Sequence, residues 1–397
     1  MRITSSTLRD AFLDTLQQAQ QRLLQTQTQI ATGRKVNKPS DDPLAAARIG
    51  ELEASLSRID QYQSNALLAQ NRLGLEEEAL VGVVNGLQRI RELAVQANNA
   101  TTGPESRQAV AVELRQQLQN LLALANTTDG QGRYLFAGFH EETQPFAQTP
   151  TGFVYSGDDG QQGVSISDHR VIFTGDPGSE VFQRIRDGNG TYSLSASAAN
   201  TGTGVLGAGT VVDPAAFVLD DYTITFLTAT DYEVRDGGGG LVSSGTYTPP
   251  QAISFLGIEI ALDGEPAAND SFMAQPSVNK DVFAMVEDLI TAIETPVSSG
   301  AGRALQQNEI GQSLADIDLA IGHLLDVRGE LGARLRALDS EIALNEGFGV
   351  QLTTTLSGIR DLDYAEAISS LTQQLQGIEA TQQTYARLQG LTLFRFL

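Results

Sequence analysis

The chain has no cysteine and no tryptophan, and only three of its 397 residues are histidines. The absence of cysteine excludes disulfides, thiolate nucleophiles and cysteine-bound zinc or iron–sulfur sites. An imidazole metal site needs several histidines together, whereas His140, His169 and His323 lie far apart in the sequence. The sequence therefore predicts no metal site and no cofactor.

Basic residues are also scarce, with 26 lysines and arginines against 48 aspartates and glutamates and a net charge of −22. A surface that neutralises phosphates needs the opposite balance, so nucleic acid is not an expected partner. No apolar run approaches the roughly 18 residues of a membrane helix, and the first 30 residues lack the apolar block of a cleaved signal peptide. We therefore expect no membrane partner, and any export must depend on a different signal.

Glycine and acidic residues concentrate in the middle of the chain. Residues 141–275 carry a net charge of −14, and 22 of the 39 glycines lie between Gly130 and Gly264. The flanks are rich in leucine, alanine and glutamine. This division predicts an α + β multidomain protein: a coiled-coil or bundle rod formed by the two arms, with an inserted, mostly antiparallel β domain. The predicted domains are residues 1–40 with 355–397 (terminal helices), 41–140 with 276–354 (helical core), and 141–275 (outer domain).

Both arms repeat apolar residues with a period of 3.5 to 3.6, which is typical of helices that bury one stripe. From Ile310 to Ile342 the apolar spacing alternates between four and three residues, which predicts one long rod-like helix. Two polar residues, Arg328 and Asn345, fall on this stripe. They either set the register of the helices or pair with a carboxylate of the N-terminal arm, and register is the favoured alternative.

The two terminal helices carry very little charge. Residues 15–33 contain one charged side chain, Arg22, and residues 367–386 contain one, Glu379, while glutamine fills the remaining positions. Short helices with a narrow apolar stripe depend on packing against a partner. An ordinary coiled coil within one chain stays an open alternative, but the repetition at both ends favours assembly of many copies. The predicted assembly residues are Phe12, Leu16, Leu23, Ile30, Ile368, Leu371, Leu375, Ile378 and Tyr385.

The acidic insert contains short β-branched and aromatic runs separated by glycine-rich turns. These runs predict strands over residues 152–157, 171–174, 222–226 and 253–258. A different hypothesis is that the insert binds or cleaves a carbohydrate. Its support is the acidic surplus of the insert together with exposed aromatics such as Tyr155, Tyr222 and Tyr232.

Several patterns resemble enzyme motifs but lack the required context. Residues 202–207 match the glycine pattern of a nucleotide loop without a preceding strand or a following helix. The adjacent carboxylates at 41–42, 158–159 and 220–221 are expected to be caps and turns, and residues 187–190 a turn too short for a calcium loop. Glu76, Glu77 and Glu78 are interpreted as a solvated face or a contact between subunits. No catalytic residue is predicted, and the protein is not expected to be an enzyme.

Three segments resemble conserved motifs of bacterial flagellins and hook-associated proteins. The first is residues 33–43, where Ser40 or Asp41 is expected to cap a helix that has Pro43 in its first turn. The others are residues 91–99 and the segment that starts at Asp361. Residues 132–138 resemble the hook-associated branch more than filament flagellins. The motif residues are Arg34, Asn37, Pro39, Asp41, Asp42, Pro43, Arg91, Glu92, Asp361 and Tyr364.

The resemblance implies a secreted structural subunit of the bacterial flagellum. Such a protein leaves the cell unfolded through the flagellar type III apparatus and assembles with copies of itself at the hook–filament junction. The implied partners are the first hook-associated protein on the hook side, flagellin on the filament side, and an export chaperone at the C-terminal helix. A filament flagellin is the alternative within the same family.

Overall fold

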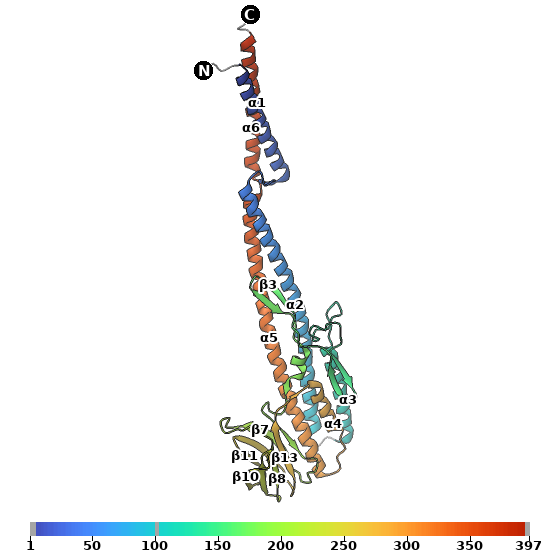
Figure 1. Ribbon diagram of the computed structural model, residues 1–397. Helices are drawn as coiled ribbons and strands as arrows, with labels where there is room; N and C mark the ends of the chain where they lie inside the picture. Colours follow the sequence, from blue (N-terminus) through green and yellow to red (C-terminus); the bar gives the residue numbers. More distant parts are fainter. Residues whose placement is uncertain (1–4, 100–102, 394–397) are drawn as a thin grey trace. The chain divides into compact units, whose positions relative to one another are not determined.

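The computed structural model describes residues 5–99 and 103–393. The chain forms two compact units (Figure 1). The terminal unit consists of residues 1–65 and 341–397, and the central unit consists of residues 66–340. Two long helices, α2 (Pro43–Asn98) and α5 (Gly300–Arg360), contribute to both units. In the described part of the chain, no helix is both long enough and apolar enough to cross a membrane.

Among the described residues of the terminal unit, the regular elements are all helices. The unit contains α1 (Ser5–Thr32), the first part of α2, the last part of α5, and α6 (Tyr364–Leu393). Helix α1 packs against α6, so the first and the last helix of the chain pair with each other. Among the described residues of this unit, only two apolar side chains, Leu356 and Ala367, are buried. The pair therefore lacks a core of the kind that stabilises an isolated domain.

The helices of the central unit bury regular heptad positions. Helix α2 buries Ala66 and every seventh residue after it to Ala94, and α5 buries Ile310 and every seventh residue after it to Leu338. This confirms the long helix that the apolar spacing predicted over residues 310–342. Helix α3 (Pro104–Ala125) starts at the predicted proline, and packs on α4 (Val282–Glu294), in which eight residues are buried.

The insert is antiparallel in every strand pair that the structure describes, which confirms the predicted fold class. The strands are β1 (Phe146–Thr149), β2 (Gly152–Tyr155), β3 (Gly163–Ser167), β4 (Arg170–Phe173), β5 (Ile185–Arg186), β6 (Tyr192–Ala196), β7 (Val205–Val211), β8 (Tyr222–Phe226), β9 (Asp231–Arg235), β10 (Leu241–Thr246), β11 (Gln251–Phe255), β12 (Ile258–Asp263), β13 (Ser271–Pro276) and β14 (Asn279–Lys280), with a π-helical turn η1 (Ser179–Gln183).

Two sheets of the insert share one hydrophobic core, which includes Phe226, Tyr247, Ile260 and Phe272. Their strand orders are β10-β9-β8-β13-β6 and β11-β12-β7.

The prediction of a single strand over residues 253–258 is wrong. This run contains the end of β11, a tight turn and the start of β12. Leu256 and Gly257 have φ angles of 42° and 77°, so both adopt the left-handed conformation that a two-residue hairpin turn requires. Leucine is a rare residue in that conformation, and the apolar run therefore concealed the turn.

The motif at residues 132–138 fixes the start of the insert. Leu135, Phe136 and Ala137 are buried. The rings of Phe136 and Phe182 meet edge to face, with their centroids 5.1 Å apart. Gly138 follows with a φ of 69°, and a β-carbon there would lie 2.1 Å from Oδ1 of Asp158. The motif thus combines three buried apolar residues with a glycine. Any larger residue at position 138 would have to displace Asp158.

Candidate assembly surface

The α1–α6 pair is held by few contacts between the helices. The rings of Phe12 and Tyr385 stack with centroids 4.0 Å apart and an interplanar angle of 10°. Nε2 of Gln374 donates a 3.1 Å hydrogen bond to Oγ1 of the buried Thr26. The structure brings one set of predicted assembly residues together in a half-buried seam: Phe12, Leu16, Leu23, Ile30, Leu371, Ile378 and Tyr385.

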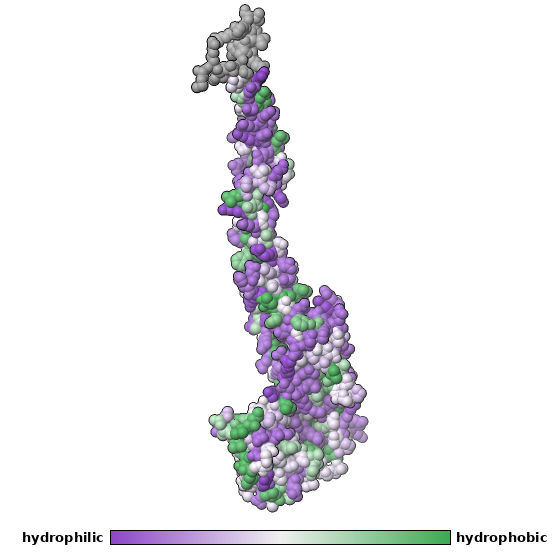
Figure 2. Space-filling model, viewed as in Figure 1, coloured by the Kyte–Doolittle hydropathy of each residue, from purple (hydrophilic) through white to green (hydrophobic). Residues whose placement is uncertain are grey.

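The other two predicted assembly residues point away from this seam. Ile368 is 53% exposed and Leu375 is 43% exposed. On the opposite helix, Leu24 is 62% exposed. Figure 2 shows hydrophobic residues scattered among hydrophilic ones along the terminal helices. The exposed large apolar residues described in this unit, which we name the terminal apolar surface, are Leu13, Leu24, Leu44, Leu344, Phe348, Val350, Tyr364, Ile368 and Leu375.

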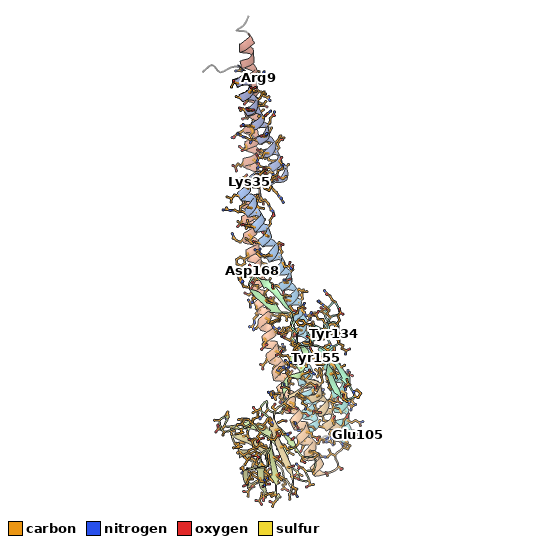
Figure 3. The ribbon with its side chains drawn as sticks, in the orientation of Figure 1. Arg9, Lys35, Glu105, Tyr134, Tyr155 and Asp168 are labelled. Carbon is orange, nitrogen blue, oxygen red and sulfur yellow. The ribbon has the colours of Figure 1, made fainter. Side chains whose placement is uncertain are left out.

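The loop between α1 and α2 pairs with the connection between α5 and α6. Arg34 and Asp361 form an isolated antiparallel bridge, flanked by backbone hydrogen bonds from Lys35 N to Arg360 O (2.7 Å) and from Leu362 N to Gly33 O (3.0 Å). Lys35 lies at this point in Figure 3. The Ser357 hydroxyl and the Arg360 guanidinium lower the pKa of Asp361, which favours its charged form next to Arg34. Two motifs far apart in sequence therefore meet.

The cap of α2 differs from the prediction. Neither Ser40 nor Asp41 caps the helix: Oδ1 of Asp42 accepts hydrogen bonds from Leu44 N (3.1 Å) and Ala45 N (2.9 Å). Pro43 is the first helical residue, as expected. Oδ2 of Asp41 instead accepts from the backbone N–H groups of Asn37 and Lys38, at 3.1 and 2.9 Å. Each carboxylate of the pair thus closes a different turn, and Pro39 is exposed within the turn that Asp41 closes.

Gly33 and Tyr364 form a contact that the sequence did not reveal. Gly33 ends α1 with a φ of 68°, the left-handed conformation common after a helix C-terminus. A β-carbon at this position would lie 2.8 Å from the Tyr364 hydroxyl. The backbone conformation therefore favours glycine, and a larger residue would also have to displace the tyrosine hydroxyl of the C-terminal motif.

The motif residues Arg91 and Glu92 belong to the central unit. Nε of Arg91 lies 2.5 Å from Oδ1 of Asp318 on α5, and Glu92 pairs with Arg89 at 2.9 Å. Arg91 and Asp318 also line a cleft of about 380 Å³ between α2, α5 and strands β6 and β7. Their ion pair joins the two long helices beside the insert.

The glutamates at 76–78 have three different environments. Glu76 is fully buried at a heptad position of α2, so its interpretation as a solvated or inter-subunit residue is wrong. Its Oε1 accepts a 3.2 Å hydrogen bond from Asp176 N. Burial, followed by the charge of Asp176, raises the pKa of Glu76 well above its usual value. Glu77 pairs with Arg328 at 2.6 Å, so the less favoured alternative for Arg328, an ion pair with the N-terminal arm, is present.

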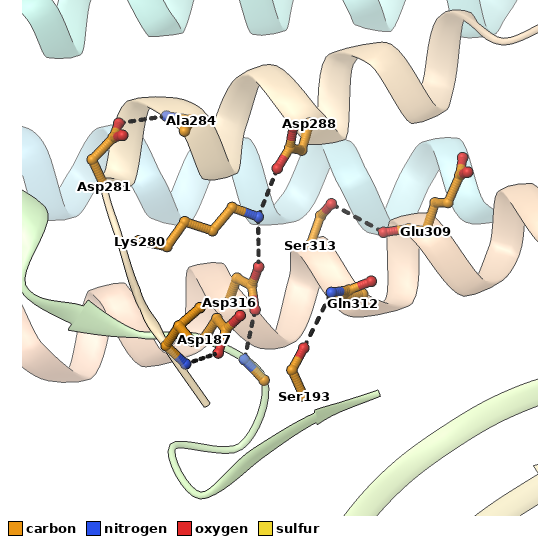
Figure 4. Close-up of polar contacts among 12 residues, drawn as sticks. Asp187, Ser193, Lys280, Asp281, Ala284, Asp288, Glu309, Gln312, Ser313 and Asp316 are labelled. Atoms are coloured by element: carbon orange, nitrogen blue, oxygen red, sulfur yellow. Dashed lines mark hydrogen bonds and ion pairs between the residues drawn. The ribbon is translucent and has the colours of Figure 1, made fainter. Parts of the chain in front are cut away.

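The turn at residues 187–190 is confirmed, and it fastens the insert to α5 (Figure 4). Gly188 N donates a 2.8 Å hydrogen bond to Oδ1 of the buried Asp316, whose Oδ2 lies 3.1 Å from Lys280 Nζ. Lys280 also pairs with Asp288 at 2.6 Å. Burial raises the pKa of Asp316, although its hydrogen bond to Gly188 and the charge of Lys280 oppose this. The carboxylate of Asp316 therefore has a structural role, because it joins the turn of the insert and Lys280 to α5.

The nucleotide-loop pattern at residues 202–207 does not form a phosphate cradle. The backbone N–H groups of Thr201 and Gly202 donate to the carboxylate of Asp270, at 2.7 and 3.0 Å. Strand β7 follows instead of a helix. Within the described residues, no cluster of three or more histidine, aspartate or glutamate side chains is arranged to hold a metal ion.

The aromatic residues invoked for carbohydrate binding are not a surface platform. Tyr222 is buried, and its hydroxyl donates to Val218 O at 2.7 Å. Tyr155 is half-buried, its hydroxyl donates to Phe136 O, and burial raises its pKa to about 12. The expectation that these two rings are exposed is wrong, so neither ring supports a carbohydrate site.

Comparison with known proteins decides the family. Residues 3–141 match a family model described as the bacterial flagellin N-terminal helical region. The flagellar hook-associated protein 3 of Escherichia coli (strain K12) is 26% identical over 368 residues, which cover 92% of this chain and 90% of that protein. The crystal structure of Xanthomonas campestris FlgL is 37% identical with a TM-score of 0.73, covering 77% of this chain and 99% of that one. The chain belongs to the FlgL family of flagellar hook-associated proteins.

Other matches agree with this assignment. The flagellar hook-associated protein-3 of Legionella pneumophila is 34% identical with a TM-score of 0.76, over 78% of this chain and 98% of that one. A flagellin of Listeria monocytogenes matches only 27% of this chain, at 27% identity. As a member of the FlgL family, the chain is a structural protein of the flagellum, located outside the cell at the hook–filament junction.

Proposed function

We propose that the terminal unit of this FlgL-family protein assembles with copies of itself at the junction through the terminal apolar surface. One observation carries the proposal: the described residues of this unit include nine large exposed apolar side chains, but the buried apolar ones are Leu356 and the small Ala367 alone. Helices depend on packing for most of their stability, so this unit gains most when neighbours cover it. Neutral glutamines on the same helices avoid repulsion between identical copies. This supports the assembly role predicted for Ile368 and Leu375, which lie on the terminal apolar surface.

The assembled copies have two different neighbours in this proposal. The first hook-associated protein contacts it on the hook side and flagellin on the filament side, and an export chaperone binds the C-terminal helix before export. The motif residues from Arg34 to Pro43, with Asp361 and Tyr364, hold the connections between the terminal helices and the long helices in a defined geometry. The protein acts through these contacts and catalyses no reaction.

Imaging the labelled protein on flagella tests the junction role. We expect one band at the tip of the hook, whereas a signal along the filament would favour the alternative of a filament flagellin. Deleting the gene supplies the second measurement. We expect hooks without filaments and flagellin subunits in the medium. Filaments that stay attached to hooks in the deletion strain would rule out the proposed role.

A further inference from the structure

An exposed apolar ridge lies on the β insert, which belongs to the central unit. We define the ridge as Val212, Val218, Leu219 and Leu256, which are 59, 55, 63 and 38% exposed. Figure 2 shows hydrophobic residues gathered at one edge of the insert, on the side of β7 and β11. Exposed apolar residues that cluster in this way mark interaction sites more often than single ones do.

The ridge is held in a fixed conformation by the β11–β12 hairpin. Gly257 O accepts hydrogen bonds from Val212 N (2.8 Å) and Asp213 N (3.0 Å). A β-carbon on Gly257 would lie 2.2 Å from Asp213 O, so the two segments are in close contact. The half-buried ring of Phe217 packs against the core, 6.3 Å from the ring of Tyr192. These contacts preform the surface at Val212 and Leu256, which lowers the entropic cost of covering it.

Carboxylates surround the ridge. Asp213, Asp220, Asp221 and Glu259 are exposed next to it in the sequence or in the paired strands. None of these four forms an ion pair with another described residue. Residues 190–275 contain ten acidic residues and one basic residue, Arg235, which pairs with Glu233 at 2.8 Å. The apolar ridge is thus bordered by uncompensated negative charge.

We propose that the ridge is a docking surface for another protein whose contact face combines apolar side chains with lysine or arginine. The apolar residues supply the area removed from water, and the carboxylates select a basic partner and repel an acidic one. A second copy of this chain does not fit, because the same carboxylates would face each other across a self-complementary contact. An anionic membrane is also disfavoured, because its negative charge would repel the carboxylates beside the ridge.

Binding of synthetic peptides to the full-length protein tests the proposal. The probes are three peptides of equal length: leucine with arginine, leucine with glutamate, and serine with arginine. We expect measurable binding of the leucine–arginine peptide alone. Its affinity should fall about tenfold, the equivalent of roughly 1.4 kcal/mol, in the variant Val218→Ser/Leu219→Ser and in the variant Asp220→Asn/Asp221→Asn.

Matched variants on the same insert serve as controls. Leu227→Ser/Leu241→Ser removes two leucines that are 56 and 60% exposed, and Asp231→Asn/Asp263→Asn removes two exposed carboxylates. Binding should be unchanged in both. Equal losses in the controls, no loss in the ridge variants, equal binding of the leucine–glutamate peptide, or no binding at all would each overturn the proposal. So would a dimer in sedimentation that Val218→Ser/Leu219→Ser dissociates, because it would identify a second copy as the occupant.

Discussion

Replacing Leu24 and Ile368 with glutamine is expected to abolish assembly at the hook while leaving the monomer folded. Both side chains are more than half exposed in the terminal unit, so their loss should change the stability of the monomer by less than about 0.5 kcal/mol. Full burial of a leucine or isoleucine side chain contributes roughly 1.5 to 3 kcal/mol. Leu24 and Ile368 are 62 and 53% exposed, so every subunit of the junction would lose a little over half of such a contribution at each of the two positions. Glutamine preserves the helix and is already the commonest residue on these faces.

Three measurements check this prediction: swimming in soft agar, the amount of the protein in purified hooks, and its amount in the medium. The variant should be exported but absent from hooks. The control Val112→Gln/Leu325→Gln removes two apolar residues of the central unit that are 64 and 46% exposed. Normal assembly of Leu24→Gln/Ile368→Gln, or an equal defect in the control, would show that the terminal apolar surface is not the assembly surface.

The second large effect is expected at Glu76, as a change in how stability depends on pH. The pKa of Glu76 is raised in the folded state above its usual value of 4.5, so the folded protein holds a proton that the unfolded chain releases. The stability that the neutral carboxyl contributes is fully present below pH 4.5. It is lost as the pH rises toward the folded-state pKa, at about 1.4 kcal/mol per pH unit.

The variant Glu76→Gln cannot lose this proton and keeps an oxygen that accepts the hydrogen bond from Asp176 N. We therefore expect the variant to become progressively more stable than the wild type as the pH rises above 4.5, in urea unfolding at a series of pH values. Asp281 and Asp316 also have raised pKa values, but they affect both proteins equally. Glu78→Gln removes the same charge from an exposed neighbour and should follow the wild type. Parallel curves for Glu76→Gln and the wild type would refute the assignment.

Glu76 also illustrates why the sequence revealed only part of the structure. The heptad spacing of the long helices is carried by many residues at once, so it was sufficient to predict the rods and their burial. Burying a charged carboxylate costs free energy, so a glutamate is normally expected at the surface. The run of three glutamates at residues 76–78 therefore favoured an interpretation as a solvated face. Ala69, Val83 and Ile90 share its heptad position. That register would have placed Glu76 in the core.

The errors in the insert and the loops have local causes. A run of apolar residues predicted one strand over residues 253–258, because the hairpin turn there uses Leu256 where asparagine or aspartate is usual. The cap of α2 was assigned to Ser40 or Asp41, one or two residues too early, because several capping residues stand in a row. The contact between Gly33 and Tyr364 joins the N-terminal and C-terminal arms, which are more than 300 residues apart in the sequence, and no local pattern predicts such a pairing.

Hydrogen exchange of the terminal helices tests the central claim most directly. The claim is that α1 and α6 have too little buried apolar surface to be stable in a free subunit and are stabilised by neighbouring copies. In dilute monomer, the amides of α1 and α6 should exchange far faster than those of α4, in which eight of 13 residues are buried. In the assembled junction, α1 and α6 should become protected. Protection of α1 and α6 in the dilute monomer equal to that of α4 would contradict the claim.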